Sequence, residues 1–178
     1  MNRIISKILT LLIFRWVYPG FNTASYSKKS LLSICLYQKI FRINGSVPWP
    51  VHFTSKVKAA KNIIRGSKAP GFSPWCYIDG RNGITIEENV WIGPRVSIIS
   101  MDHDLNSYSS YKKEQPIVIR KNSLLTTGCI ILPGVELGEH TVVAAGTIVT
   151  KSFPEGNQVL AGNPARVIKK IEDYKSQD

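Results

Sequence analysis

Cysteine and histidine are scarce in this chain, with three of each among 178 residues. The cysteines are far apart and do not suggest a disulfide framework; they are Cys35, Cys76 and Cys129. A metal site needs several ligands that converge, and the histidines are also far apart; they are His52, His103 and His140. The chain has no phosphate-binding glycine loop and no dinucleotide fingerprint. We therefore expect no metal cofactor and no nucleotide site built on either motif.

Acidic residues are absent from the first 78 positions, which contain twelve Lys or Arg residues. Residues 79–178 contain eleven basic and twelve acidic side chains, so the whole formal excess of +11 comes from the N-terminal part. Such asymmetry predicts a polyanionic partner or surface. A nucleic acid is disfavoured because no recognition motif accompanies the charge. We expect an anionic membrane surface, contacted through residues 1–45.

No apolar run in the chain is long enough to cross a bilayer. The first twenty residues are rich in apolar side chains, but their longest uncharged run, 8–14, has seven residues. A spanning helix needs about 20. A secretory signal would have a longer apolar core and a small-residue cleavage site. We therefore expect a cytoplasmic protein, peripheral on the inner face of the cell membrane.

From residue 84 onward the chain repeats every six residues. The units are ITIEEN (84–89), VWIGPR (90–95), VSIISM (96–101), IVIRKN (117–122), SLLTTG (123–128), CIILPG (129–134), VELGEH (135–140), TVVAAG (141–146) and TIVTKS (147–152). All nine third positions are branched aliphatic residues, namely Ile86, Ile92, Ile98, Ile119, Leu125, Ile131, Leu137, Val143 and Val149. A helix with ~3.6 residues per turn would scatter these positions, whereas stacked strands and turns align them in one interior column. We predict an all-β solenoid of roughly five coils.

The repeat weakens upstream of residue 84. The units VHFTSK (51–56), VKAAKN (57–62), FSPWCY (72–77) and IDGRNG (78–83) can be registered there around a three-residue slip at 69–71. Terminal coils of a solenoid are atypical because they cap the stack. We predict a helical appendage at 1–46, a solenoid at 47–163 with a loop inserted at 102–116, and a short polar helix at 164–178.

Two apolar, basic stretches of the appendage have the pattern of amphipathic helices. The first, 1–20, carries Arg3, Lys7 and Arg15. The second, 26–43, has apolar residues at helical spacing; they are Leu31, Leu32, Cys35, Leu36 and Ile40. Both would lie on an anionic membrane face, with Trp16 and Tyr18 at the interface. Alternatively, they pack on the open end of the solenoid or on other subunits.

The segment ILPGVELGEHTVVAAGTIVTKSFPEGNQVLAGNPARVIKKI (131–171) resembles the C-terminal signature of the hexapeptide-repeat acyltransferases. The likeness covers roughly residues 47–171 and is strongest to the maltose, galactoside and exopolysaccharide O-acetyltransferases. It implies a left-handed parallel β-helix, a homotrimer, and acetyl-CoA bound between neighbouring subunits. The chain departs from the family pattern at Leu124, Leu125 and Thr126, where many relatives have Trp-Ile-Gly. A Trp-Ile-Gly occurs instead at 91–93.

The repeat is interrupted once, by the polar insertion DHDLNSYSSYKKEQ between Met101 and Pro116. Loops inserted at the corners of a solenoid usually serve its binding face. The insertion contains His103, and an imidazole with an ordinary pKa of about 6.5 suits a general base near neutral pH. The resemblance implies that His103 is the catalytic residue. Three carboxylates compete to support its ring: Asp102, Asp104 and Glu114.

The resemblance also implies which residues contact acetyl-CoA; they are Thr127, Ala145, Thr150, Lys151, Arg166 and Lys169. The first two would meet the pantetheine arm through backbone groups, and the next two would lie beside the adenine. The last two would lie near the phosphates, where cationic side chains suit an anionic ligand. The alternative for these residues is a solvated tail helix or packing in the wall of the solenoid.

These features predict a transferase that moves an acetyl group from acetyl-CoA to a hydroxyl of a saccharide in surface or exopolysaccharide biosynthesis. The acceptor would be lipid-linked or nucleotide-linked. No cysteine or serine is placed by a motif for an acyl-enzyme, so a ternary complex with His103 as base is favoured. Two alternatives stay open: N-acetylation of an amino sugar or other small acceptor, and a non-catalytic trimeric scaffold.

Overall fold

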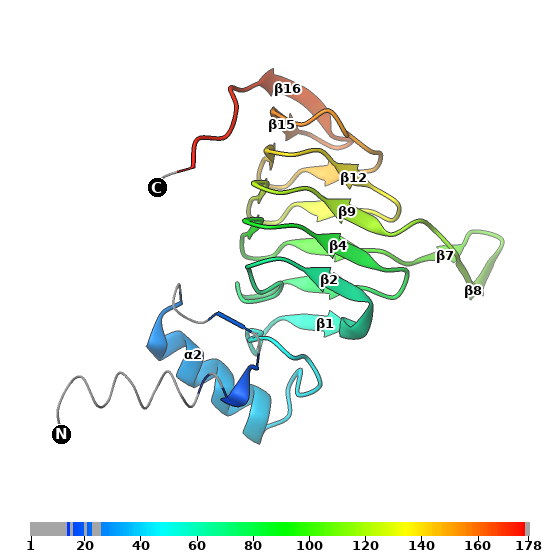
Figure 1. Ribbon diagram of the computed structural model, residues 1–178. Helices are drawn as coiled ribbons and strands as arrows, with labels where there is room; N and C mark the ends of the chain where they lie inside the picture. The colour runs from blue at the N-terminus through cyan, green and yellow to red at the C-terminus, as the bar shows by residue number, and fades with distance from the viewer. Residues whose placement is uncertain (1–13, 15, 20, 23–25, 177–178) are drawn as a thin grey trace.

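The computed structural model describes residues 14, 16–19, 21–22 and 26–176. Its main body is a solenoid whose short strands stack into three sheets (Figure 1). Face A contains β1 (Lys56–Lys58), β3 (Tyr77–Asp79), β6 (Ser97–Ile99), β11 (Ile130–Ile131) and β14 (Ile148–Val149). Face B contains β2 (Ile63–Arg65), β4 (Ile84–Ile86), β9 (Ile117–Ile119) and β12 (Glu136–Leu137). Face C contains β5 (Trp91–Ile92), β10 (Leu124–Leu125), β13 (Thr141–Val143), β15 (Gln158–Ala161) and β16 (Arg166–Lys170).

In each complete coil the chain forms strands on faces A, B and C in turn, so three rows of turns run along the solenoid. The A–B edge joins face A to face B and includes residues 132–135 and 150–152. The C–A edge joins face C to face A and includes residues 93–96, 126–129 and 144–147. Equivalent turns in successive coils therefore lie one above another.

The interior column predicted from the six-residue period is confirmed. On face A, Ile131 pairs with Ile98 below it and with Val149 above it. Eight of the nine third positions are buried, and Ile92 is the half-buried exception. Each coil thus adds one aliphatic layer per face to a continuous core, which no single unit could form alone.

The predicted register of the weak upstream units is wrong. The unit IDGRNG puts Ile78 at a first position, but Ile78 pairs with Ile98, which is a third position; the unit VKAAKN is misregistered in the same way. The reason is a longer turn in the early coils. Ile78 and Ile86 are eight positions apart, whereas the equivalent Ile131 and Leu137 are six apart. Extra turn residues shift the count without breaking the interior column.

The second apolar stretch forms the predicted N-terminal helix. Helix α2 (Lys28–Cys35) continues into a π-helical turn, η1 (Leu36–Ile40), beside the first coil (Figure 1). The inner side of this segment is buried and consists of Leu31, Ile34 and Gln38. Its outer side leaves apolar groups exposed, at Leu32, Leu36, Ile40, Phe41 and Ile43. The segment therefore packs on the end of the solenoid with one side and keeps an apolar side open.

Gln38 fixes this segment through buried hydrogen bonds of its side chain. Its side-chain nitrogen donates to the carbonyls of Val47 at 3.0 Å and Trp49 at 2.9 Å. Its side-chain oxygen accepts from the hydroxyl of Tyr18 at 2.9 Å. Because buried polar groups are costly unless they are paired, this network makes the N-terminal segment part of the folded core.

The helix predicted over residues 1–20 falls mainly outside the described residues. Of those described, Phe14 and Tyr18 are buried and Trp16 is 83% exposed. The placement of Tyr18 at a membrane interface is therefore wrong, because its ring lies in the core and its hydroxyl bonds to Gln38.

The C-terminal helix predicted for 164–178 does not form in the described residues, which end at 176. Residues 162–165 turn the chain back, and β16 pairs antiparallel with β15, with Val167 opposite Leu160. The backbone groups on the outer side of β15 would otherwise form an open sheet edge, and the returning strand pairs with them. A short polar segment has little helical preference of its own to oppose this pairing.

The insertion forms a two-stranded hairpin, β7 (Asp102–Asp104) and β8 (Ser107–Lys112), which projects from the A–B edge (Figure 1). A short 3-10 turn, η2 (Ala60–Asn62), precedes β2. Within the described ranges, no helix has both the length and the apolar character needed to cross a bilayer.

Candidate active site

The hairpin is tied to the solenoid by Asn82 in the turn between β3 and β4. The Asn82 side-chain amide donates to the carbonyls of Ser100 at 2.9 Å and Lys112 at 3.0 Å, one at each end of the hairpin. The buried Ser100 hydroxyl accepts from the Asn82 backbone N–H at 2.9 Å and donates to the Asp79 carbonyl at 2.7 Å. These bonds hold both ends of an otherwise exposed loop at a fixed place on the A–B edge.

His103 lies on β7 with its imidazole exposed. Its Nδ1 is 2.6 Å from the carbonyl oxygen of Tyr108. Because a carbonyl can only accept, Nδ1 carries the proton, and Nε2 is then the nitrogen with a free lone pair. The flanking carboxylates bond to backbone instead: Asp102 accepts from the His103 N–H at 2.8 Å, and Asp104 accepts from the Asn106 N–H at 2.8 Å. The ring is therefore oriented by a backbone carbonyl rather than by a carboxylate.

A chain of contacts connects this imidazole to the solenoid wall. The Tyr111 ring lies opposite on β8, with its centre 4.5 Å from that of His103. The Arg81 guanidinium lies 4.8 Å from the centre of the Tyr111 ring and donates to the buried Asp79 carboxylate at 2.8 and 3.0 Å. Burial alone would raise the pKa of Asp79, but hydrogen bonds from the side chain and backbone of Arg81 hold that pKa below its ordinary value. An ionised pair thus supports one side of the candidate base.

Thr127 and Ala145, predicted to contact pantetheine, lie in successive turns of the C–A edge. The Gly146 N–H donates to the Thr127 carbonyl at 3.0 Å, so the two turns are stacked. Gly128 and Gly146 have positive φ angles of 70° and 68°, and a Cβ added at either would meet nothing within 4 Å. These two positions therefore favour glycine because of their backbone conformation. The turns present an open strip that an extended ligand can follow.

The other predicted cofactor residues lie elsewhere. Thr150 and Lys151 are exposed on the A–B edge, directly after β14. Arg166 and Lys169 are exposed on β16, and neither forms an ion pair with another described residue. The structure therefore divides the predicted site residues between different parts of the chain.

The separation of His103 from the C–A strip follows from the topology. The His103 hairpin leaves the A–B edge, whereas Thr127 and Ala145 lie on the C–A edge, across a face of the solenoid. A single copy of the chain does not bring the imidazole to the strip.

The remaining histidines and the cysteines have local structural partners. His52 Nδ1 is 2.8 Å from the Thr54 hydroxyl, and His140 Nδ1 is 3.1 Å from the Asn157 side-chain oxygen. Burial raises the pKa of Cys129 to about 12 and also raises that of Cys76. Within the described part of the chain, no three His, Cys, Asp or Glu side chains gather where they could hold a metal ion.

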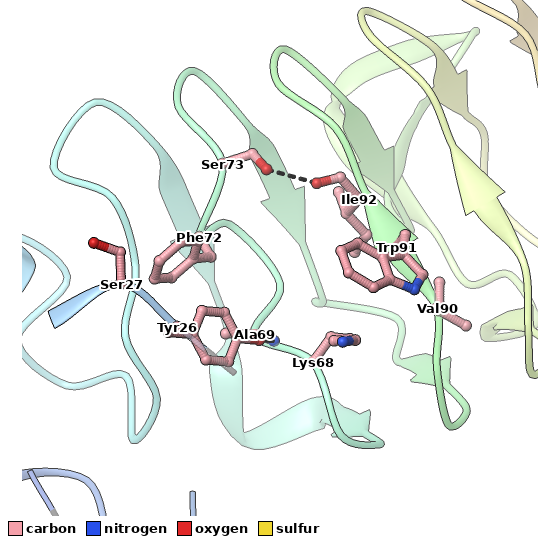
Figure 2. Close-up of a pocket in the computed structure, with 9 residues that line it drawn as sticks. All are labelled: Tyr26, Ser27, Lys68, Ala69, Phe72, Ser73, Val90, Trp91 and Ile92. Carbon is pink, nitrogen blue, oxygen red and sulfur yellow. Dashed lines mark hydrogen bonds between the residues drawn. The ribbon is translucent and has the colours of Figure 1, made fainter. Parts of the chain in front are cut away.

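A cavity of about 210 Å³ opens on face C beneath β5 (Figure 2). It is lined by Tyr26, Ser27, Lys68, Ala69, Phe72, Ser73, Val90, Trp91 and Ile92. Figure 2 shows the Tyr26 and Phe72 rings on one side and the Trp91 indole on the other, with Lys68 between them at the rim. None of the residues predicted from sequence lines this cavity. Two sequence features coincide with it, although neither predicted a cavity: the slip at 69–71 and the Trp-Ile-Gly at 91–93.

No family model matches the chain. Over 149 residues it is 32% identical to a presumed acetyltransferase of Staphylococcus aureus strain Mu50, which covers 82% of this chain and 71% of that protein. The chain belongs to the hexapeptide-repeat acetyltransferases. It is also 41% identical over 93 residues to a presumed acetyltransferase of Schizosaccharomyces pombe, and 36% identical over 102 residues to one of Saccharomyces cerevisiae. The matches span 44% and 51% of those two proteins, about half of their length.

Solved structures of hexapeptide-repeat acetyltransferases share the fold. A maltose O-acetyltransferase of Clostridium difficile superposes with a TM-score of 0.58 at 24% identity, covering 97% of this chain and 90% of that one. A galactoside acetyltransferase in complex with coenzyme A gives 0.55 at 22% identity, covering 100% and 89%. A Vibrio cholerae acetyltransferase complexed with acetyl coenzyme A gives 0.54 at 21% identity, covering 91% and 98%.

The departure from the family pattern at Leu124 has a simple geometry in this hexapeptide-repeat acetyltransferase. Leu124 pairs with Trp91 and Leu125 pairs with Ile92 on neighbouring strands. The tryptophan expected at 124 therefore lies one coil nearer the N-terminus on the same face, where it borders the cavity of Figure 2.

Proposed function

We propose that this protein transfers an acetyl group from acetyl-CoA to a hydroxyl of a saccharide, with His103 as the general base. The contact between Nδ1 of His103 and the Tyr108 carbonyl carries the proposal, because in the neutral ring it places the proton on Nδ1 and the lone pair on Nε2. Nε2 accepts the proton of the acceptor hydroxyl as that oxygen attacks the thioester carbonyl carbon. When the carbon–sulfur bond breaks, the imidazolium returns the proton to the departing thiolate.

Direct transfer in a ternary complex is supported over an acyl-enzyme. A cysteine nucleophile reacts as the thiolate, and burial raises the pKa values of Cys76 and Cys129. Both thiols are also inside the solenoid, where a thioester could not reach them. The sulfur atoms therefore fill space in the wall, and the acetyl group passes straight to the acceptor.

Acetyl-CoA lies along the C–A strip of one subunit and meets His103 of a neighbour in a homotrimer. The open turns of Thr127 and Ala145 suit the pantetheine arm, and the unpaired cations Arg166 and Lys169 suit the phosphates. Thr150 and Lys151 of the neighbour, on the same A–B edge as its His103, lie beside the adenine. The separation of the imidazole from the strip supports this arrangement, because a second copy can supply the half of the site that one copy lacks.

The test of the base compares His103→Asn with His140→Asn. His140 has a positive φ of 53°, which Asn tolerates well, so it is a matched control. We expect His103→Asn to lower kcat by roughly 10²–10⁴-fold, with acetyl-CoA affinity within twofold of wild type and His140→Asn near wild type. Near-normal turnover by His103→Asn would remove His103 from the role. A wild-type protein that consumes no thioester with saccharide or amino-sugar acceptors would instead indicate a scaffold.

We assign the protein to surface or exopolysaccharide biosynthesis on the inner face of the cell membrane, with a lipid-linked or nucleotide-linked acceptor. The outer side of α2 and η1 supports this, because Leu32, Leu36 and Ile40 are spaced four apart and are 56%, 44% and 68% exposed. Basic residues of the same segment could meet anionic headgroups; they are Lys28, Lys29, Lys39 and Arg42.

Vesicle binding tests this association. Removing residues 1–45 would be a poor test because Gln38 belongs to the core. The double variant Leu36→Ser, Ile40→Ser should lose binding to vesicles of phosphatidylglycerol and phosphatidylcholine, while Ile64→Ser, which is 69% exposed on face B, should bind like wild type. Equal sedimentation of all three proteins, or none with any vesicle, would contradict the membrane role.

A further inference from the structure

The cavity of Figure 2 exists because one coil lacks its strand on face C. Faces A and B continue below β5 through β3, β1 and β2, but sheet C ends at β5. Between faces B and A, this coil contains one extra residue: Arg65 and Ile78 are thirteen positions apart, whereas Ile86 and Ile98 are twelve apart. The chain bulges at the slip and leaves Ile92 with no strand beneath it. For this reason Ile92 is only half-buried, unlike the other eight third positions of the units from residue 84 onward.

The walls of the cavity are aromatic and held in place. The rings of Tyr26 and Phe72 are 4.5 Å apart, and the Tyr26 hydroxyl accepts from the Ala69 N–H at 3.0 Å. On the opposite side, the Trp91 indole N–H donates to the Asn89 side-chain oxygen at 2.9 Å. Each polar atom of these rings is thus engaged at the rim, so the cavity presents mainly their apolar faces (Figure 2).

Lys68 adds a single positive charge to this apolar space. Its ammonium nitrogen lies 3.9 Å from the centre of a Trp91 ring, and it forms no ion pair with any of the described side chains. The first acidic residue of the chain is Asp79. The cavity therefore combines apolar walls with one positive charge, which suits a ligand that has an apolar ring face and an anionic group.

The cavity also lies next to the C–A strip. The Ser73 hydroxyl donates to the Ile92 carbonyl at 2.6 Å, where the cavity meets the turns of that edge. The next turn continues upward, because the Gly93 N–H donates to the Leu125 carbonyl at 2.8 Å and the Gly128 N–H to the Pro94 carbonyl at 3.0 Å. One coil, about 4.8 Å, thus separates the cavity from the turn that contains Thr127.

We propose that this cavity binds the acceptor, and that the acceptor is a sugar ring carrying a phosphate. The apolar face of the ring packs between Trp91 and the Tyr26–Phe72 pair, as ligands commonly do in aromatic pockets. Lys68 pairs with the phosphate. The assignment of this sugar phosphate as the acetyl acceptor rests on the proposed function, whereas its binding does not.

The experiment measures the affinity of the whole protein for glucose 1-phosphate, glucose and inorganic phosphate by calorimetry, without acetyl-CoA. Wild type should bind glucose 1-phosphate more tightly than either part alone. Trp91→Ala should weaken binding of both sugars by about 10-fold, and Trp91→Phe should restore most of it. Lys68→Met should weaken the binding of glucose 1-phosphate by about 5-fold or more and leave the affinity for glucose unchanged. Trp16→Ala and Lys56→Met, which lie outside the cavity, should match wild type.

Three results would overturn the proposal: glucose 1-phosphate bound no better than phosphate alone, equal losses in the cavity and control variants, or affinity unaffected by both cavity substitutions. Thermal melts of each variant identify a loss of binding that comes from unfolding. If Trp91→Ala does not fold, Lys68→Met at the rim still tests the proposal. His103→Asn should retain sugar-phosphate binding. If sugar-phosphate binding depends on Trp91 and Lys68 but no acetyl transfer is found, the proposed function is wrong and the binding site stands. If Trp91→Ala transfers acetyl groups with an unchanged KM for the acceptor, the cavity is not the acceptor site and the proposed function stands.

Discussion

The ring of Tyr111 limits how the His103 imidazole can turn. The Tyr108 carbonyl fixes one ring nitrogen at 2.6 Å, and the Tyr111 ring covers one side of the imidazole at 4.5 Å. Tyr111 is held in turn by the Arg81 guanidinium at 4.8 Å. If His103 is the general base, as we propose, its orientation affects the barrier directly, and Tyr111 and Arg81 are then positioning residues.

Removing the Tyr111 ring should lower kcat and leave the cofactor site intact. We expect Tyr111→Ala to lower kcat by about 10-fold, with the KM for acetyl-CoA unchanged, because the hairpin carries none of the C–A strip. Tyr111→Phe keeps the ring and should be close to wild type. Steady-state kinetics check this, and Arg81→Ala combined with Tyr111→Ala should cost less than the two single losses together. Equal defects in the Phe and Ala variants would show that the ring is not the cause.

Asp79 should make stability fall in acid. Its pKa in the folded protein is below the ordinary value, so its ionised form stabilises the fold above about pH 4 and this contribution is lost as the pH falls further. Asp79→Asn should therefore melt lower than wild type at pH 7, and the gap should narrow between pH 5 and pH 3. Glu155→Gln, which removes an exposed partner of Lys170, should show no such gap. A constant gap across this range would contradict the argument.

The candidate base was easier to predict from the sequence than the groups that orient its ring. The break in the repeat singled out His103, but the sequence offered Asp102, Asp104 and Glu114 as partners for its ring. The ring bonds to the backbone carbonyl of Tyr108 instead. A backbone group has no sequence signature, and the contact depends on the hairpin register, in which His103 faces Tyr111.

At the scale of strands and coils, glycine sets how closely neighbouring turns can approach. A Cβ at Gly138 would overlap the backbone of the next coil at Pro154 and Gly156. Backbone on both sides cannot move without disturbing the stack, so Gly138→Ala should destabilise the protein by about 1–3 kcal/mol. Thermal melting checks this, with Gly146→Asn as control, because that turn has open space around it. Equal melting temperatures for Gly138→Ala and wild type would show that neighbouring coils can move apart to accommodate a Cβ at this position.

The elements that sequence predicted are those with a sustained period. From residue 84 the third positions form the interior column, because each coil repeats the same geometry. Upstream, the longer turn between Ile78 and Ile86 breaks the count while the column continues. The tail was wrongly assigned to a helix because its partner, the edge of β15, is defined only after the solenoid has formed.

At the scale of the whole molecule, the proposed site needs two copies of the chain. The imidazole of His103 extends from the A–B edge, and the strip at Thr127 and Ala145 follows the C–A edge. In a closed ring of three, the first edge of every copy can meet the second edge of its neighbour through the same contact. The trimer would then have three equivalent sites, each shared.

Mixed trimers should therefore recover activity from two inactive parents. His103→Asn removes the base, and Ala145→Trp places a bulky ring on the exposed strip where the pantetheine arm would lie. In random mixed trimers, roughly a quarter of the interfaces join an intact imidazole to an intact strip, so co-expression should restore up to about a quarter of wild-type kcat. Light scattering should give a trimer mass for each parent and for the mixture. Mixed trimers without recovered activity, or a monomeric wild type, would place the whole site within one chain, since complementation requires residues from two copies.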